Sequence, residues 1–219
     1  MEHSSPPADK TRLFYKETPM TPTMPPKAAT LVSILPGATP LSRHARTLGL
    51  ALAGSALIAL SAKIQVPFWP VPMTMQTFVV IALAMAFGAR LGAATVALYL
   101  FEGALGLPVF AGTPEKGIGL AYMMGPTGGY LAGFLAAAWF AGWMAEQGWD
   151  RTFLKAAAVN ALATAIVFIL GVPWLAVLIG PDKAIAAGLT PFLLSSAFKV
   201  ALGGAVMPLA WSFARRLRG

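Results

Sequence analysis

Six long apolar stretches, separated by glycine, proline and charged residues, dominate this sequence of 219 residues. Inside a bilayer every backbone N–H and C=O must be paired within the protein, so stretches of this kind are expected to form helices. The chain is 57% hydrophobic and 11% charged, whereas about a quarter of the residues of a soluble domain are charged. The sequence therefore predicts an all-α integral membrane protein with six transmembrane helices, at residues 47–62, 73–87, 91–107, 127–145, 153–179 and 189–214.

The distribution of lysine and arginine predicts the orientation. Of the sixteen such residues, twelve fall on one side of the predicted spans, Lys63, Lys116 and Lys183 fall on the other, and Lys199 lies within the sixth stretch. Cytoplasmic loops carry the excess of positive charge. We therefore expect both termini in the cytoplasm and the chain in the cytoplasmic (inner) membrane of a bacterium. In a soluble protein the net charge of +8 would indicate nucleic acid, but at helix ends it indicates a lipid bilayer.

The first forty residues differ from the rest of the chain. They contain eight prolines and no periodic apolar face, so they cannot bury enough apolar surface to offset the entropy of ordering. We expect residues 1–40 to be a disordered, Pro-rich cytoplasmic tail and residues 41–219 to form the six-helix membrane domain. The absence of cysteine excludes disulfides and thiolate metal sites, and both histidines, His3 and His44, precede the first predicted span, so no metal site is expected.

Lys199 lies about ten residues into the last apolar stretch. At roughly 1.5 Å per helical residue, this places its ammonium group near the middle of a hydrocarbon core about 30 Å thick. A charge at that depth costs at least a few kcal/mol unless it faces protein, water or a ligand. The alternatives to a functional role are a lysine that extends to the interface and a structural ion pair. The depth favours a role in binding a ligand.

Two connections on the lysine-poor side have unusual compositions. Within residues 63–78, Pro67, Pro70 and Pro72 fix the backbone and remove hydrogen-bond donors, which predicts a rigid, extended segment. Residues 106–130 form a long connection rich in glycine and proline. Such a connection in a compact bundle is usually a lid, a binding loop or a re-entrant piece, although two ordinary connectors would also fit.

Three segments in these connections resemble the signature motifs of a known family. They read Pro70-Val-Pro-Met-Thr-Met-Gln-Thr-Phe78, Gly106-Leu-Pro-Val-Phe-Ala-Gly112 and Gly125-Pro-Thr-Gly-Gly-Tyr-Leu-Ala-Gly-Phe134. The chain resembles the BioY family, the biotin-binding S components of energy-coupling-factor (ECF) transporters, from about Ala51 to Lys199. The resemblance implies an S-component-type bundle of six helices that captures biotin for uptake, with no cofactor of its own. It also implies assembly with an ECF coupling subunit and ABC-type ATPases.

The chain itself has no phosphate-binding loop of the form G-x-x-x-x-G-K-[ST]. ATP-driven transport would therefore take its energy from a partner chain. Ala51, Ser55 and Ala59 are spaced four residues apart, and small residues at this spacing let another helix approach closely. The resemblance suggests that this face contacts the coupling subunit, and packing inside the bundle is the alternative.

Biotin carries an anionic carboxylate, a neutral ureido ring and an apolar sulfur ring, so its site needs a cation, a few polar groups and apolar walls. Lys199 and Lys116 are the candidate cations. Glu102 is a candidate polar group near the outer end of the third stretch, and Gln76 can offer both a donor and an acceptor to the ureido ring. Tyr122 and Trp69 are candidate walls, although aromatic residues at this depth are often interface anchors.

One position departs from the family pattern. BioY proteins commonly have an aspartate three residues before the lysine of the last helix, where this chain has Ser196. Residues three apart share a helix face, so Ser196 is expected to face the site together with Lys199. A hydroxyl can bind a ureido group but cannot neutralise the lysine. We therefore consider the hypothesis that Glu102 supplies the missing negative charge.

Two other functions fit parts of the pattern. An intramembrane hydrolase could use a Ser196–Lys199 dyad, but two residues three apart provide no oxyanion hole by themselves. The other is a carrier of a different vitamin, or one that works without ATPase partners. Binding of biotin to the purified protein would distinguish these two alternatives from a biotin-capture subunit.

Overall fold

The computed structural model describes residues 29–34, 40–66 and 73–216. In this part of the chain the longer helices are α1 (Pro40–Lys63), α2 (Gln76–Phe87), α3 (Ala89–Ala104), α5 (Gly128–Glu146), α6 (Phe153–Ile179) and α8 (Leu193–Arg216). The shorter elements are the helices α4 (Gly119–Met123) and α7 (Pro181–Gly188), the 3-10 turns η2 (Val32–Ile34) and η3 (Thr190–Phe192), and the strands β1 (Gln65–Val66) and β2 (Met73–Thr74). The prediction of a helical protein is confirmed.

The helix ends differ from the predicted ones where charges or turns interrupt the apolar pattern. α1 begins at Pro40 rather than at residue 47, because Arg43 is exposed and the Arg46 guanidinium has a backbone acceptor, so neither charge ends the helix. The predicted second helix loses its first residues, because Met73 and Thr74 pair with Val66 and Gln65 in an antiparallel ladder. In α3 the helix starts two residues earlier and ends three residues earlier than predicted. α8 starts at Leu193, since η3 occupies the residues before it.

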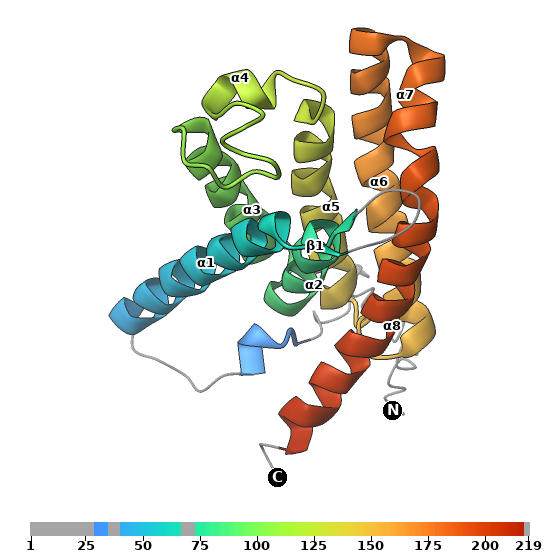
Figure 1. Cartoon of the computed structure of the whole chain (residues 1–219). Coiled ribbons are helices and arrows are strands. Elements are labelled where there is room, and N and C mark those ends of the chain that lie inside the picture. Colours follow the sequence, from blue (N-terminus) through green and yellow to red (C-terminus); the bar gives the residue numbers. More distant parts are fainter. Residues whose placement is uncertain (1–28, 35–39, 67–72, 217–219) are drawn as a thin grey trace, which may run out of the picture.

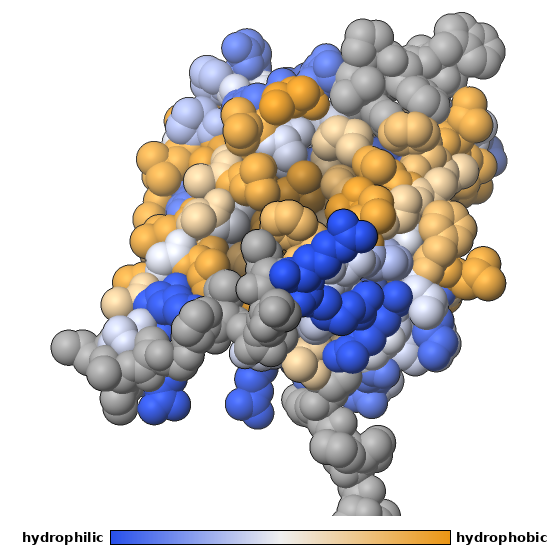
Figure 2. Space-filling view, turned by 90° about the horizontal axis from the view of Figure 1, so that it is seen from below, coloured by the Kyte–Doolittle hydropathy of each residue, from blue (hydrophilic) through white to orange (hydrophobic). Residues whose placement is uncertain are grey.

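Several of these helices are those of a multi-pass membrane protein. The segments Ser42–Lys63, Phe153–Ile179 and Pro181–Arg216 are long and apolar enough to cross a bilayer. α2 has only 12 residues, or about 18 Å of helix. α4 and α7 lie at one end of the molecule, and α8 ends at the opposite end (Figure 1). Seen from the latter end, hydrophilic side chains gather beside a wide hydrophobic surface (Figure 2).

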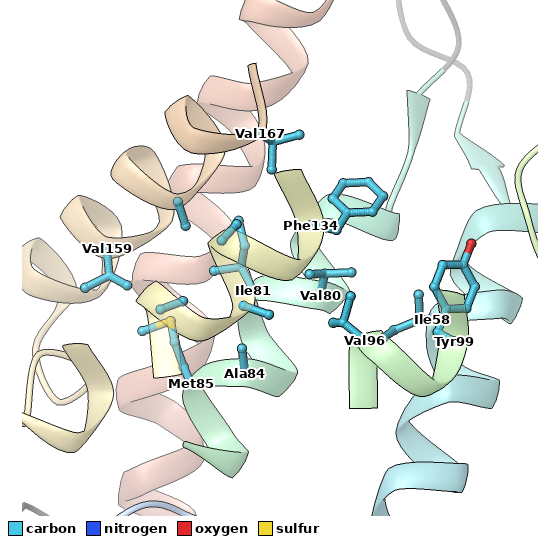
Figure 3. Packing of buried hydrophobic residues seen from close by; sticks show 14 of the residues in the cluster. Ile58, Val80, Ile81, Ala84, Met85, Val96, Tyr99, Phe134, Val159 and Val167 are labelled. Atoms are coloured by element: carbon cyan, nitrogen blue, oxygen red, sulfur yellow. The ribbon is translucent and has the colours of Figure 1, made fainter. Parts of the chain in front are cut away.

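The core forms where α2 and α5 pack between the other helices. Figure 3 shows Val80, Ile81 and Met85 of α2 pointing at side chains from α3, α5 and α6. Glycines allow the backbones to approach closely: a Cβ at Gly142 would lie 2.5 Å from the backbone of Gly88 and Ala89. Helices in a membrane associate through such small residues, because the hydrophobic effect does not drive association in lipid and close van der Waals packing takes its place.

α6 and α8 interlock at a polar side chain. The amide of Asn160 on α6 is buried and donates to the carbonyl of Ala156 at 2.9 Å. It lies directly over Gly203 of α8, where a Cβ would lie 2.4 Å from the amide atoms. A side chain at this position of α8 would displace the Asn160 amide, so Gly203 allows the two helices to pack closely here.

The connection between α3 and α5 is an ordered layer built around Phe110. The Phe110 ring fills the space above Gly103, where a Cβ would lie 2.0 Å from it, and stacks on Tyr122 at a centroid distance of 4.9 Å. The Lys63 ammonium at the end of α1 donates to the hydroxyl of Thr113 at 2.9 Å. These contacts tie the connection to the ends of α1 and α3.

The segment 29–34 lies against the bundle at the ends of α2 and α5. Thr30 is buried, Leu31 packs on the core cluster and the Arg46 guanidinium donates to the carbonyl of Val32 at 2.6 Å. Arg151 donates to the carbonyl of Ala29 at 3.1 Å. These residues belong to the expected tail, so the contacts of the bundle extend beyond the expected boundary at residue 40. Residues 1–28 and 35–39 lie outside the described part.

Candidate functional site

A cavity of about 300 Å³ lies between α2, α5, α6, α7 and α8. Its walls come from segments far apart in the sequence: β2 and α2, the first turns of α5, the middle of α6, and the α7–η3–α8 region. The lining residues are Thr74, Thr77, Pro126, Thr127, Tyr130, Phe134, Thr164, Val167, Phe168, Leu175, Ala187, Gly188, Phe192, Ser196 and Lys199. Figure 1 shows α7 at the end of the bundle away from the C-terminus, with α6 and α8 leading away from it.

Lys199 is the charged residue of the cavity wall. It lies in the second turn of α8 and is only 7% exposed. No hydrogen bond or ion pair to its ammonium group is present among the described residues. Since a buried cation without a partner is costly, its position calls for an anionic group in the cavity.

Ser196 precedes Lys199 by three residues and lines the same wall. The start of α8 produces this arrangement. Ser195 is buried and its hydroxyl donates to the carbonyl of Phe192 at 3.0 Å, which closes the turn from η3 into the helix. Ser195 therefore stabilises the helix start, while Ser196 belongs to the cavity lining.

The remaining wall is apolar with scattered hydroxyl groups. Phe134, Phe168 and Phe192 supply aromatic surface, and four threonines supply hydroxyls: Thr74, Thr77, Thr127 and Thr164. No aspartate or glutamate belongs to the lining among the described residues. A cavity with one cation, several hydroxyls and aromatic walls suits a small molecule that is anionic at one end and neutral and hydrogen-bonding elsewhere.

Glu102 does not join Lys199 in this cavity. Its carboxylate accepts a hydrogen bond from the hydroxyl of Ser55, which is fully buried on α1, and it is absent from the lining. The α1–α3 contact therefore accounts for this carboxylate. The hypothesis that Glu102 compensates for the serine at position 196 has no support in this geometry, because the two side chains belong to different parts of the bundle.

Gln76 and Tyr122 hold the connection between α3 and α5 rather than the cavity wall. The Gln76 amide donates to the hydroxyl of Tyr99 at 2.8 Å, and the Tyr99 hydroxyl donates to the carbonyl of Val109 at 3.2 Å. The Tyr122 hydroxyl donates to the carbonyl of Ala111 at 2.8 Å. Neither of the two predicted residues is part of the lining.

The other two predicted residues are placed as follows. Lys116 is exposed in the connection between α3 and α5, with its aliphatic chain beside Gly112, and it does not reach the cavity lining. Trp69 lies outside the described residues. Of the predicted substrate-binding residues, the structure therefore brings together Lys199 and Ser196.

The small residues of α1 face the bundle. Ala51 and Ser55 are buried, Ala59 packs against the core cluster, and α1 contacts α3 along this side. The alternative of packing inside the bundle explains this spacing, because Ser55 already donates to Glu102. The burial of this stripe does not support its expected role in binding a partner helix.

Sequence reasoning missed Tyr130 and Thr164. Tyr130 stands in the quoted Gly125–Phe134 motif, so the motif itself could have indicated it. Thr164 is a single hydroxyl in the middle of a long apolar helix, which is a weaker signal, because threonine often bonds only to its own helix backbone.

The profile of the BioY family matches residues 28–216. The biotin transporter BioY of Thermotoga maritima is 38% identical over 153 residues, which cover 69% of this chain and 88% of that protein. The biotin transporter BioY2 of Lactococcus lactis is 32% identical over 158 residues, covering 71% and 85%.

A crystal structure of the S-component for biotin from an ECF-type ABC transporter has a similar fold. The TM-score is 0.62 at 24% sequence identity, with 83% of this chain and 95% of the other covered. The match therefore supports the arrangement of helices described above. With the profile match over most of the sequence and relatives above 30% identity, the chain belongs to the BioY family.

Proposed function

We propose that this chain is the substrate-capture subunit of a biotin uptake system. The relatives from Thermotoga maritima and Lactococcus lactis are biotin transporters, and the similar solved structure is an S-component for biotin. The family consists of transporter components rather than enzymes, so Ser196 and Lys199 are assigned to binding and not to catalysis.

The observation that carries the proposal is the unpaired Lys199 ammonium in the cavity wall. The carboxylate of biotin supplies the anion that this cation lacks. The hydroxyls of Ser196 and Thr164 can bind the ureido ring, and the phenylalanines can cover the apolar sulfur ring. Gln76, Tyr122 and Glu102 are assigned to the support of the surrounding connections and helices, and Lys116 to the exposed surface of the connection between α3 and α5.

The proposal includes a topology. α1, α2, α3, α5, α6 and α8 would be six spans, with both termini in the cytoplasm and the cavity opening outward. The charge asymmetry of the sequence supports this orientation. The cytoplasmic (inner) membrane of a bacterium would be the location, and an ECF coupling subunit with ABC-type ATPases would supply energy, since the chain has no phosphate-binding loop.

Equilibrium binding of labelled biotin to the purified protein tests the proposal. Removing one partner of a buried charge pair costs about 3–5 kcal/mol, so we expect Lys199→Met to weaken binding by about two to three orders of magnitude. Thermal stability of the ligand-free protein should not fall, because the variant removes a buried charge that has no partner in the part of the chain that the structure describes. Lys116→Met, an exposed lysine outside the cavity, is the matched control and should lose much less affinity.

Biotin amidated at its carboxylate identifies the end of the ligand that Lys199 binds. If the ammonium binds the carboxylate, wild type and Lys199→Met should bind the amide with similar, weak affinity. Near-wild-type affinity of Lys199→Met for biotin would contradict the proposal.

A further inference from the structure

Tyr130 connects α5 to the far end of α7. Its hydroxyl donates to the carbonyl of Gly188 at 2.9 Å, across 58 positions of sequence. Gly188 is the last residue of α7, and both residues line the cavity. The bond therefore closes the wall between the first turn of α5 and the element that leads into α8.

Two glycines shape the space that the tyrosine occupies. A Cβ at Gly171 of α6 would lie 2.3 Å from the Tyr130 ring, and a Cβ at Gly188 would lie 2.3 Å from its hydroxyl oxygen. The ring also packs edge-on against Phe168 at a centroid distance of 6.4 Å. The ring of Tyr130 therefore packs against α6, and its hydroxyl group contacts α7.

α7 packs back against α6 and η3, and most of its side chains are exposed. Of its eight residues only Ala184 and Gly188 are buried, while Asp182, Lys183 and Ile185 are exposed. The helix follows Gly180, whose φ of 87° belongs to the left-handed region that favours glycine. Among the described residues, the side-chain hydrogen bond that joins α7 to α5 is the one from Tyr130.

We propose that the Tyr130–Gly188 hydrogen bond holds α7 closed over the cavity, and that its opening admits and releases the substrate. Tyr130 is then a positioning residue: it acts through α7 and η3, and through them on the start of α8, where Ser196 and Lys199 lie. The identity of the substrate rests on the proposed function, whereas the closure of α7 can be tested without any ligand.

The chain contains no cysteine, so the position of α7 can be measured by labelling. Ala184 belongs to α7 and its side chain is fully buried. An Ala184→Cys variant should therefore react slowly with a membrane-impermeant maleimide. Adding Tyr130→Phe, which removes only the hydroxyl, should increase the labelling rate about fivefold, the factor that corresponds to a hydrogen bond of about 1 kcal/mol. Tyr122→Phe removes a similar hydroxyl-to-carbonyl bond, at Ala111, and should leave labelling at position 184 unchanged.

A second variant tests the same contact from the other side. Gly188→Ala places a methyl group against the Tyr130 hydroxyl and should also raise the labelling rate. In the double variant the nearest ring carbon would lie 3.6 Å from that methyl group, an ordinary contact, while the Leu175 side chain stays 2.7 Å away in both proteins that carry Gly188→Ala. The Tyr130→Phe/Gly188→Ala protein should therefore label no faster than Gly188→Ala alone.

Biotin binding separates this proposal from the function. With biotin, labelling at position 184 should slow, and Tyr130→Phe should raise the association and dissociation rates of biotin together. If labelling responds to Tyr130→Phe but biotin does not bind, the closure stands and the biotin function fails. Unchanged labelling in Tyr130→Phe would overturn the closure. A loss of biotin affinity without faster labelling would overturn it as well, since the hydroxyl would then contact the ligand directly.

Discussion

Ser196 and Lys199 line the same wall of the cavity, three residues apart on α8, whereas the neighbouring Ser195 turns inward to the carbonyl of Phe192. Adjacent serines therefore have different roles. We expect Ser196→Ala to weaken biotin binding about fivefold, the effect of losing one hydrogen bond of about 1 kcal/mol, with unchanged thermal stability.

Ser195→Ala is the matched comparison. It should lower thermal stability with little effect on affinity, because its hydroxyl closes the turn into α8. Binding titrations and melting curves of both variants check this pair. A Ser196→Ala protein that binds biotin as tightly as wild type would remove Ser196 from the site.

The bond between Ser55 and Glu102 joins α1 to α3, away from the cavity lining. Ser55→Ala should lower the free energy of unfolding by about 1 kcal/mol, a typical value for a hydrogen bond between membrane helices. The affinity for biotin should stay close to that of wild type. A strong loss of biotin affinity in Ser55→Ala with an unchanged melting temperature would instead support a role of Glu102 in biotin binding.

Gly103 leaves room for the Phe110 ring, which a Cβ would approach to 2.0 Å. Gly103→Ala should destabilise the protein by about 1–3 kcal/mol, the usual cost of overpacking a core. Gly49→Ala, at a helical position with nothing within 4 Å, should be neutral or slightly stabilising, because alanine favours helix over glycine. Thermal unfolding of the two variants measures the difference, and equal melting temperatures would contradict the tight packing of Phe110.

Asp150, in the turn between α5 and α6, is fully buried; one carboxylate oxygen accepts from the Trp211 indole. The other has no hydrogen-bond partner among the described residues, with Arg151 Nε 4.0 Å away. Burial raises the pKa of Asp150 above the ordinary value of 3.8. Between the ordinary pKa and this raised pKa, Asp150 keeps its proton in the folded state, whereas the unfolded chain has already released it. Stability should fall as the pH rises from about 4 through this raised pKa.

The measurement is the melting temperature as a function of pH. Asp150→Asn keeps an oxygen for the Trp211 indole and removes the titration, so its profile should be flatter over this window, with higher stability at neutral pH. Asp182→Asn, an exposed acid in α7, should keep the wild-type profile. A steeper pH dependence in Asp150→Asn would contradict the sign of this argument.

The sequence correctly predicted the helices that are determined by residues close to one another in the chain. Residues 153–179 were predicted as a helix with the same ends as α6, because the apolar run is bounded by Arg151 and by Gly180. Lys199 was identified because a charge in an apolar run is costly wherever the helix packs. α4 and α7 were not predicted, since short helices depend on the surfaces on which they rest.

The roles of polar side chains that bridge helices could not be predicted in this way. Glu102 was assigned to the ligand site because nothing in the sequence pairs it with Ser55, 47 residues earlier. Gln76 is similar: its partner Tyr99 is set by the packing of α2 on α3. Residues 29–34 are mostly apolar but too short a segment to show a period. Their contacts depend on two arginines from other segments, which donate to the carbonyls of Val32 and Ala29.

The seating of Asn160 on Gly203 has a consequence for the lysine one helical turn away. Gly203 follows Lys199 by four residues, so both lie on the same side of α8. With the amide wedged at Gly203, α8 can neither slide along α6 nor rotate against it without losing that fit. The position of the Lys199 ammonium is therefore fixed relative to α6. We expect α6 and α8 to move as one rigid pair in any transport step.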